Sequence, residues 1–162
     1  MTSAGNRHNL SSAQVKDRIL RFCAYQERSH EEVRQKLHNL GSTSDEADEL
    51  MVFLIHEGFL NEERFARSFA RGKFRMKHWG RIRITNNLEA RGISKNCIQI
   101  GLTEIDPEEY LQTLNKLLTA KAADTRDANI FVRRNKVATF AIRKGFEPDL
   151  VWEAVKSLLP DN

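Results

Sequence analysis

The chain repeats one pattern three times, and this repetition constrains its fold more than any other feature. Each copy has a glycine twelve positions after its first residue, at Gly41, Gly92 and Gly145. Each also carries two apolar residues four positions apart, which places both side chains on one face of a helix. These pairs are Val33/Leu37, Ile84/Leu88 and Val137/Ala141. A glycine after the last turn is a common left-handed helix stop, so the copies 29–41, 80–92 and 133–145 are predicted to be helices that end alike.

An amphipathic segment precedes and another follows each copy, which predicts nine helices in three units of three. Helix-start signals support the boundaries: Asn61 stands before two acidic residues, and Pro107 and Pro148 suit first-turn positions. The predicted units are 13–59, 60–106 and 107–160, preceded by a polar lead, 1–12, that is expected to be disordered.

The predicted fold class is therefore all-α, with three tandem three-helix repeats. A unit of about 50 residues buries little apolar surface alone, so neighbouring units are expected to share contacts in an elongated, curved array. The 162 residues include 8 Gly and 3 Pro, which argues against a loop-rich all-β fold. A single compact helical globule with a coincidental repeat is the alternative.

Positive charge is concentrated in the middle of the chain. Between Arg64 and Lys95 there are ten basic residues and one acid, Glu89, a segment charge of +9 in a chain of formal net charge +4. The basic residues are Arg64, Arg67, Arg71, Lys73, Arg75, Lys77, Arg81, Arg83, Arg91 and Lys95. By contrast, the stretch from Thr43 to Glu63 has seven acids and no Lys or Arg.

On a helix that starts near Glu62, the arginines at 64, 67, 71 and 75 form one outward stripe. Phe65, Phe69 and Met76 are expected on a separate, inward face. A run of charge is often only a solvated surface, but one of nearly uniform sign costs self-repulsion unless an anion offsets it. We therefore predict a binding surface for DNA, RNA or an acidic protein.

Trp79, with Phe74 and His78 nearby, is a candidate for stacking on a nucleic-acid base. Ordinary packing in the core or between units is the alternative interpretation for these rings, and the commoner one.

The sequence offers no site for catalysis, cofactors or metals. Histidines and cysteines show no metal-ligand spacing, and no phosphate-binding loop or nucleophile motif occurs. No apolar run has the length of a signal peptide or a membrane span. These observations predict a cytoplasmic protein that is not an enzyme and does not bind a membrane.

Three motifs in the sequence resemble motifs of a known protein family. The run from Leu60 to Ala66, then Phe69, then Gly80-Arg81-Ile82-Arg83-Ile84 through Gly92-Ile93 resembles the central signature of the RecX family of recombination regulators. Arg28-Ser29 with Glu32-Val33 and Lys36-Leu37 is similar to that family's first-repeat motif. Arg143-Lys144-Gly145-Phe146 is similar to its third.

The resemblance implies tandem three-helix repeats and a role in DNA repair, homologous recombination and the SOS response. It implies that the chain binds the RecA recombinase filament on single-stranded DNA. We expect the chain to be a monomer that touches the DNA directly or through the filament. It further implies inhibition of the recombinase's ATPase, strand-exchange and coprotease activities, by groove binding or by end capping.

Two other functions fit the residues. Three-helix units with a basic helix also suit a stand-alone DNA-binding module of helix-turn-helix type. A helical scaffold for some other protein is the third interpretation.

Overall fold

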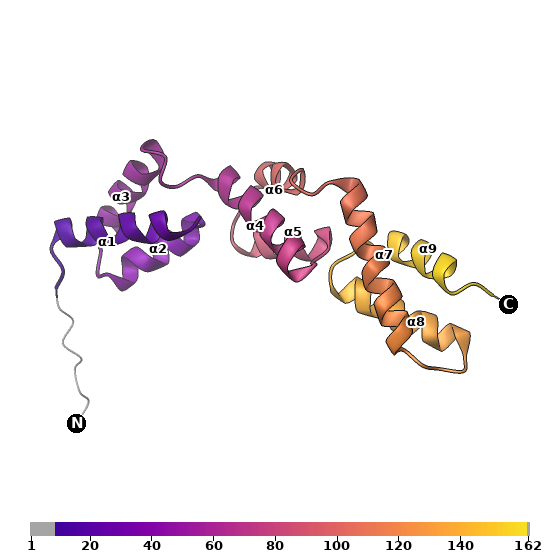
Figure 1. Ribbon diagram of the computed structural model, residues 1–162. Coiled ribbons are helices and arrows are strands. Elements are labelled where there is room, and N and C mark those ends of the chain that lie inside the picture. Colours follow the sequence, from indigo (N-terminus) through magenta and orange to yellow (C-terminus); the bar gives the residue numbers. More distant parts are fainter. Residues whose placement is uncertain (1–8, 162) are drawn as a thin grey trace, which may run out of the picture. The chain divides into compact units, whose positions relative to one another are not determined.

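The computed structural model describes residues 9–161, and within that range it contains nine α-helices and no strand (Figure 1). The helices are α1 (Ser12–Tyr25), α2 (His30–Asn39), α3 (Ser44–His56), α4 (Glu62–Lys77), α5 (Arg81–Ala90), α6 (Lys95–Leu102), α7 (Pro107–Asp124), α8 (Ile130–Arg143) and α9 (Pro148–Leu158). The all-α prediction with helices in three triplets is confirmed. Residues 1–8 of the predicted polar lead lie outside the described range, and Ser11 already caps α1.

The repeated glycines end the middle helix of every triplet in the same way. Gly41, Gly92 and Gly145 have φ of +90°, +77° and +101°. In each case the glycine N–H bonds to the carbonyl three residues earlier, and the next N–H bonds to the carbonyl five residues earlier. This is the Schellman arrangement, which requires a left-handed residue and therefore favours glycine. The repeat seen in the sequence is a repeat in the structure.

The chain divides into two compact units, Met1–Phe65 and Ala66–Asn162, here called the N-terminal and C-terminal units. The core of the N-terminal unit comes from all three helices of the first triplet, and Leu60 closes it. Buried Ser29 is the N-cap of α2, and its hydroxyl accepts the Glu32 N–H at 3.1 Å. The C-terminal unit holds α5 to α9 and most of α4.

The inward face of α4 differs from the prediction. Met76 is 80% exposed, whereas Ala66, Ala70 and Phe74 are buried at successive four-residue steps. Two alanines occupy this stripe because α6 approaches closely: a Cβ atom on Gly101 would lie 2.8 Å from the Ala66 carbonyl oxygen. Met76 lies two residues after Phe74, about 200° round the helix and so on the face opposite the stripe, where it reaches solvent.

The second and third triplets meet at a backbone contact within the C-terminal unit. The Gly80 N–H donates to the Lys144 carbonyl at 2.8 Å, and the Ile82 N–H donates to the Gly145 carbonyl at 2.9 Å. Beside this contact, the Tyr110 ring packs between Phe74 and Phe146, with centroid separations of 5.8 and 5.0 Å. These contacts join α5, α7 and α8 into one core.

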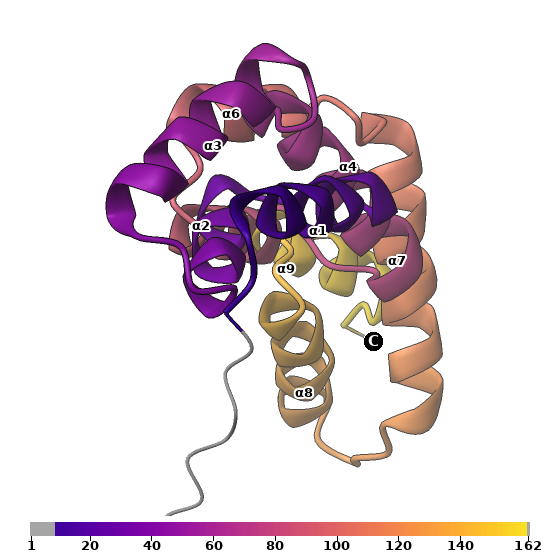
Figure 2. The ribbon, with the colours of Figure 1, turned by 90° about the vertical axis from the view of Figure 1, so that its left-hand side faces the viewer.

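The third triplet begins its middle helix earlier than the repeat predicted. Helix α8 starts at Ile130, three residues before Arg133, because the Asn129 side chain accepts the N–H groups of Phe131 and Val132. Helices α7, α8 and α9 pack against one another, and α7 is the long orange helix in Figures 1 and 2.

Candidate functional site

The ten basic residues predicted to form one surface fall into three groups. The first group is ion-paired. Arg64 Nε lies 2.5 Å from Glu27 Oε1 in the N-terminal unit. In the C-terminal unit, Arg67 and Arg71 share Glu104, with N–O distances of 3.1 and 3.3 Å.

Arg81 belongs to the same group. Its guanidinium lies 2.9 Å from Glu147 Oε2 and covers the face of the Tyr110 ring. The Tyr110 hydroxyl accepts the Arg81 N–H and donates to the other Glu147 oxygen. Burial, followed by the hydrogen bond to Glu147, raises the pKa of Tyr110 above its ordinary value. This network holds α5 and α7 against the start of α9, so the role of Arg81 here is structural.

The second group gathers around Trp79, and we call Phe69, Lys73, Trp79, Arg83 and Arg91 the Trp79 cluster. The indole meets Phe69 edge-on at 6.3 Å. Lys73 Nζ and Arg83 Cζ lie 4.9 and 4.2 Å from the indole centroid, and Arg91 lies over Phe69. Each cation–π contact contributes about 0.5–1 kcal/mol at such partly exposed positions.

A turn at His78 brings Trp79 into this cluster. His78 has φ of +54°, the only positive φ on a described residue other than glycine, and it lies between α4 and α5. The left-handed turn directs the chain back along α4, and the Trp79 N–H bonds to the Lys73 carbonyl at 3.2 Å. Phe74, the other aromatic candidate for stacking, is 3% exposed and belongs to the core.

The third group, Arg75, Lys77 and Lys95, is exposed and forms no ion pair with a described residue. Lys95 is the first residue of α6, where the helix dipole disfavours a cation. Its position therefore adds nothing to the stability of the helix. Lys73 and Arg83 also lack an acidic partner within the described range, so five of the ten cations are free to meet an anion.

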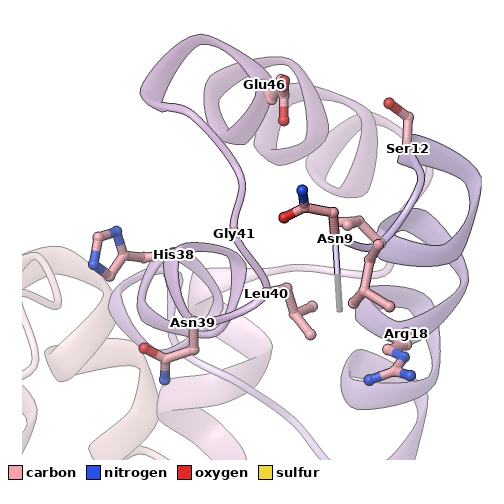
Figure 3. A pocket seen from close by; sticks show the side chains of 10 residues that line it. Asn9, Ser12, Arg18, His38, Asn39, Leu40, Gly41 and Glu46 are labelled. Atoms are coloured by element: carbon pink, nitrogen blue, oxygen red, sulfur yellow. The ribbon is translucent and has the colours of Figure 1, made fainter. Parts of the chain in front are cut away.

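One hollow lies in the N-terminal unit, and its lining has charges of both signs. Its volume is about 860 Å³, and Arg18, His38 and Glu46 are among its lining residues (Figure 3). Figure 3 shows these side chains spread around its rim without converging on one point. The described residues contain no group of His, Cys, Asp and Glu suited to hold a metal ion. None of their helices is long and apolar enough to cross a membrane.

The fold and the cations on α4 and α5 define a class of protein built from tandem three-helix domains with a cationic middle domain. Two family models match the chain: "RecX, second three-helix domain" over residues 61–102, and "RecX, third three-helix domain" over residues 108–155. The chain belongs to the RecX family.

Relatives and solved structures agree with that assignment. A "Regulatory protein RecX" from Halorhodospira halophila is 28% identical over 156 residues, 94% of this chain and 92% of the relative. One from Clostridium botulinum is 27% identical over 134 residues, 82% of this chain but only 62% of the relative, so the chain spans less than two thirds of some relatives. The crystal structure of RecX from Lactobacillus salivarius has the same fold, with a TM-score of 0.81 at 23% identity, covering 91% of this chain and 96% of that one.

Proposed function

We propose that this protein binds the RecA recombinase filament on single-stranded DNA and inhibits its ATPase, strand-exchange and coprotease activities. Membership of a family whose members are named regulatory proteins supports a regulatory role. The observation that carries the proposal is the set of unpaired cations on α4 and α5, with Lys73 and Arg83 held against one indole.

Cations whose side chains are restrained by an aromatic ring bind an anionic partner better than mobile ones. Lys73 and Arg83 repel each other, and the ring face offsets only part of that repulsion. A phosphate or carboxylate bound at either cation would offset more, and their side chains would lose less conformational freedom on binding because the ring already restrains them. Arginine also presents a planar fork that binds phosphate or carboxylate through two parallel hydrogen bonds.

The three helix triplets, proposed as the domains 13–59, 60–106 and 107–160, would give the chain several separate contacts with successive recombinase subunits. Weak contacts to an assembled filament add through multivalency. Acidic side chains on α3, including Asp45 and Glu49, would meet basic filament surfaces. We propose that the protein acts in this way as a monomer in the cytoplasm, without catalysing a reaction.

The experiment is the rate of single-stranded-DNA-dependent ATP hydrolysis by the recombinase. The double variant Arg75→Glu/Lys77→Glu reverses two free cations, and we expect it to need roughly tenfold more protein for half suppression, about 1.4 kcal/mol. The double variant Lys116→Glu/Lys156→Glu makes the same charge change at two other exposed positions and should suppress normally. Equal suppression by both folded variants would remove the α4–α5 surface from the mechanism.

Groove binding and end capping differ in time course. Protein added to preformed filaments should slow hydrolysis at once if it binds along the groove. Capping should slow it only as subunits leave the filament.

The stand-alone DNA-binding module is the second candidate, and the triplets of short helices with a cationic middle domain favour it. Direct DNA binding would weaken steeply with salt in the absence of recombinase. If DNA binding alone caused the suppression, the protein would not slow ATP hydrolysis by a recombinase that hydrolyses ATP without single-stranded DNA.

A further inference from the structure

We infer that the third triplet carries a second cationic site, a hollow between α7 and α8 that binds the phosphate groups of a single nucleic-acid strand. The hollow has a volume of about 590 Å³ and lies within the C-terminal unit. Its basic lining residues are Arg83, Lys121, Lys136, Arg143 and Lys144. Thr125, Asn135, Thr139 and Phe140 complete the lining, which contains no acidic residue.

Five cations around one hollow are not explained by the stability of the fold. Lys121, Arg143 and Lys144 form no ion pair with a described residue, and Arg83 likewise has only the Trp79 ring. Lys136 Nζ lies 3.4 Å from Asp127 Oδ2. Cations of one sign in a concave surface raise the local concentration of anions and destabilise the free protein by repulsion.

Other basic residues of the same segment show the contrast. Arg133 donates to the carbonyls of Thr125 and Ala122, and so closes the turn between α7 and α8. Arg134 donates to the Leu159 carbonyl and pairs with Asp161. These two arginines are used by the fold, whereas the cations of the hollow other than Lys136 have no acidic partner among the described residues.

The lining fits phosphodiester groups better than the carboxylates of a protein. Lys121 and Lys144 lie over the Phe140 ring at 5.0 and 5.9 Å, so the lining of the hollow combines an aromatic ring with cations. Hydroxyl and amide donors from Thr139 and Asn135 stand beside them. Proteins that bind single strands combine cations that track the backbone with aromatic rings beside the bases. Carboxylates would use the cations but gain little from the ring.

Arg83 connects this hollow to the Trp79 cluster. The same guanidinium that lies 4.2 Å from the indole centroid also lines the hollow. A strand whose phosphates occupy the hollow would therefore pass Arg83 and reach Trp79, which is half-buried and offers part of its ring to a base. The inference goes beyond the proposed function, because it adds a nucleic-acid site formed mainly by α7 and α8 to the α4–α5 surface.

The test measures binding of a fluorescein-labelled oligo-dT strand to the full chain by fluorescence anisotropy. The double variant Lys136→Glu/Arg143→Glu reverses two exposed lining residues on one face of α8, and Lys116→Glu/Lys156→Glu is the matched control. Each phosphate contact contributes about 0.7 to the slope of log affinity against log salt for single strands. We expect the α8 variant to lose roughly tenfold or more in affinity and about 1.4 from this slope, and the control to lose less than about threefold.

A milder variant, Lys136→Gln/Arg143→Gln, should lose affinity in the same direction by less, which guards against misfolding of the reversed pair. Equal losses in the α8 variant and the control, or no binding of oligo-dT by the wild type, would overturn the inference while leaving suppression of the recombinase untouched. Loss of suppression by an α8 variant that still binds oligo-dT normally would also overturn it, because the hollow would then be receiving an acidic protein surface.

Discussion

Gly80 has no room for a side chain, and adding one methyl group there should separate the second and third triplets. A Cβ atom on Gly80 would lie 2.2 Å from both the carbonyl carbon of Gly145 and the nitrogen of Phe146. Gly80 has φ of −76°, an ordinary conformation, so it is space alone that requires glycine.

The cost of Gly80→Ala follows from what must move. Forcing a methyl group into close-packed backbone costs about 1–3 kcal/mol. Separating the helices also stretches the two hydrogen bonds that join them, at about 1 kcal/mol each. The total is about 3–5 kcal/mol, and its lower end alone would lower the melting temperature of a unit the size of Ala66–Asn162 by roughly 12 to 24 °C.

Tryptophan fluorescence is the assay, because both tryptophans, Trp79 and Trp152, lie in the C-terminal unit. Gly72→Ala is the matched control: it lies inside α4, and a Cβ atom there would meet nothing within 4 Å. Removing glycine from a helix stabilises by about 0.5–1 kcal/mol, so this variant should melt a few degrees higher. A Gly80→Ala protein that melts with or above the wild type would refute the close contact.

Three further perturbations test the local chemistry. Tyr110→Phe should reduce the loss of stability at alkaline pH. Because the pKa of Tyr110 is raised in the folded protein, its neutral hydroxyl stabilises the fold fully below the ordinary pKa near 10, and this stabilisation is lost as the pH rises further. Urea unfolding midpoints measured above pH 10 should therefore fall less in the variant than in the wild type. Ser29→Ala removes a buried helix cap and should cost about 1–2 kcal/mol in denaturant unfolding of the N-terminal unit followed by circular dichroism; an unchanged midpoint would contradict the capping role. Glu104→Gln releases Arg67 and Arg71 from their shared carboxylate and should strengthen oligo-dT binding roughly threefold at low salt, a gain that disappears as salt screens the charges. Weaker binding by this variant would mean that Glu104 positions the arginines rather than neutralising them.

Features decided by neighbouring residues were predictable from the sequence. The glycines at 41, 92 and 145 end helices because their own backbone freedom and the next residue's N–H settle the geometry. Pro148 marks a helix start because its ring fixes φ, and Asn61 marks one because its side chain accepts the Arg64 N–H. The earlier start of α8 was not predicted, because Asn129 is followed by Ile and Phe, which have a weaker preference for helices than most residues of a first turn.

Features decided by distant residues were not predictable. Glu104 pairs with Arg67 and Arg71 although it lies 37 and 33 positions away in the chain. The prediction from the sequence therefore treated both arginines as available for binding. The hollow between α7 and α8 was hidden in a similar way. Residues 121–144 contain seven basic and two acidic residues, a net charge of +5, but that charge is distributed over two helices whose facing sides only the fold brings together.

The most direct test of the central proposal is the binding of the protein to recombinase filaments assembled on immobilised single-stranded DNA with a non-hydrolysable ATP analogue. We expect the wild type to bind these filaments in proportion to the recombinase present and at salt concentrations that remove it from bare DNA. Arg75→Glu/Lys77→Glu should bind them more weakly than Lys116→Glu/Lys156→Glu. Retention of the folded wild type no greater on filaments than on bare DNA would contradict the proposal.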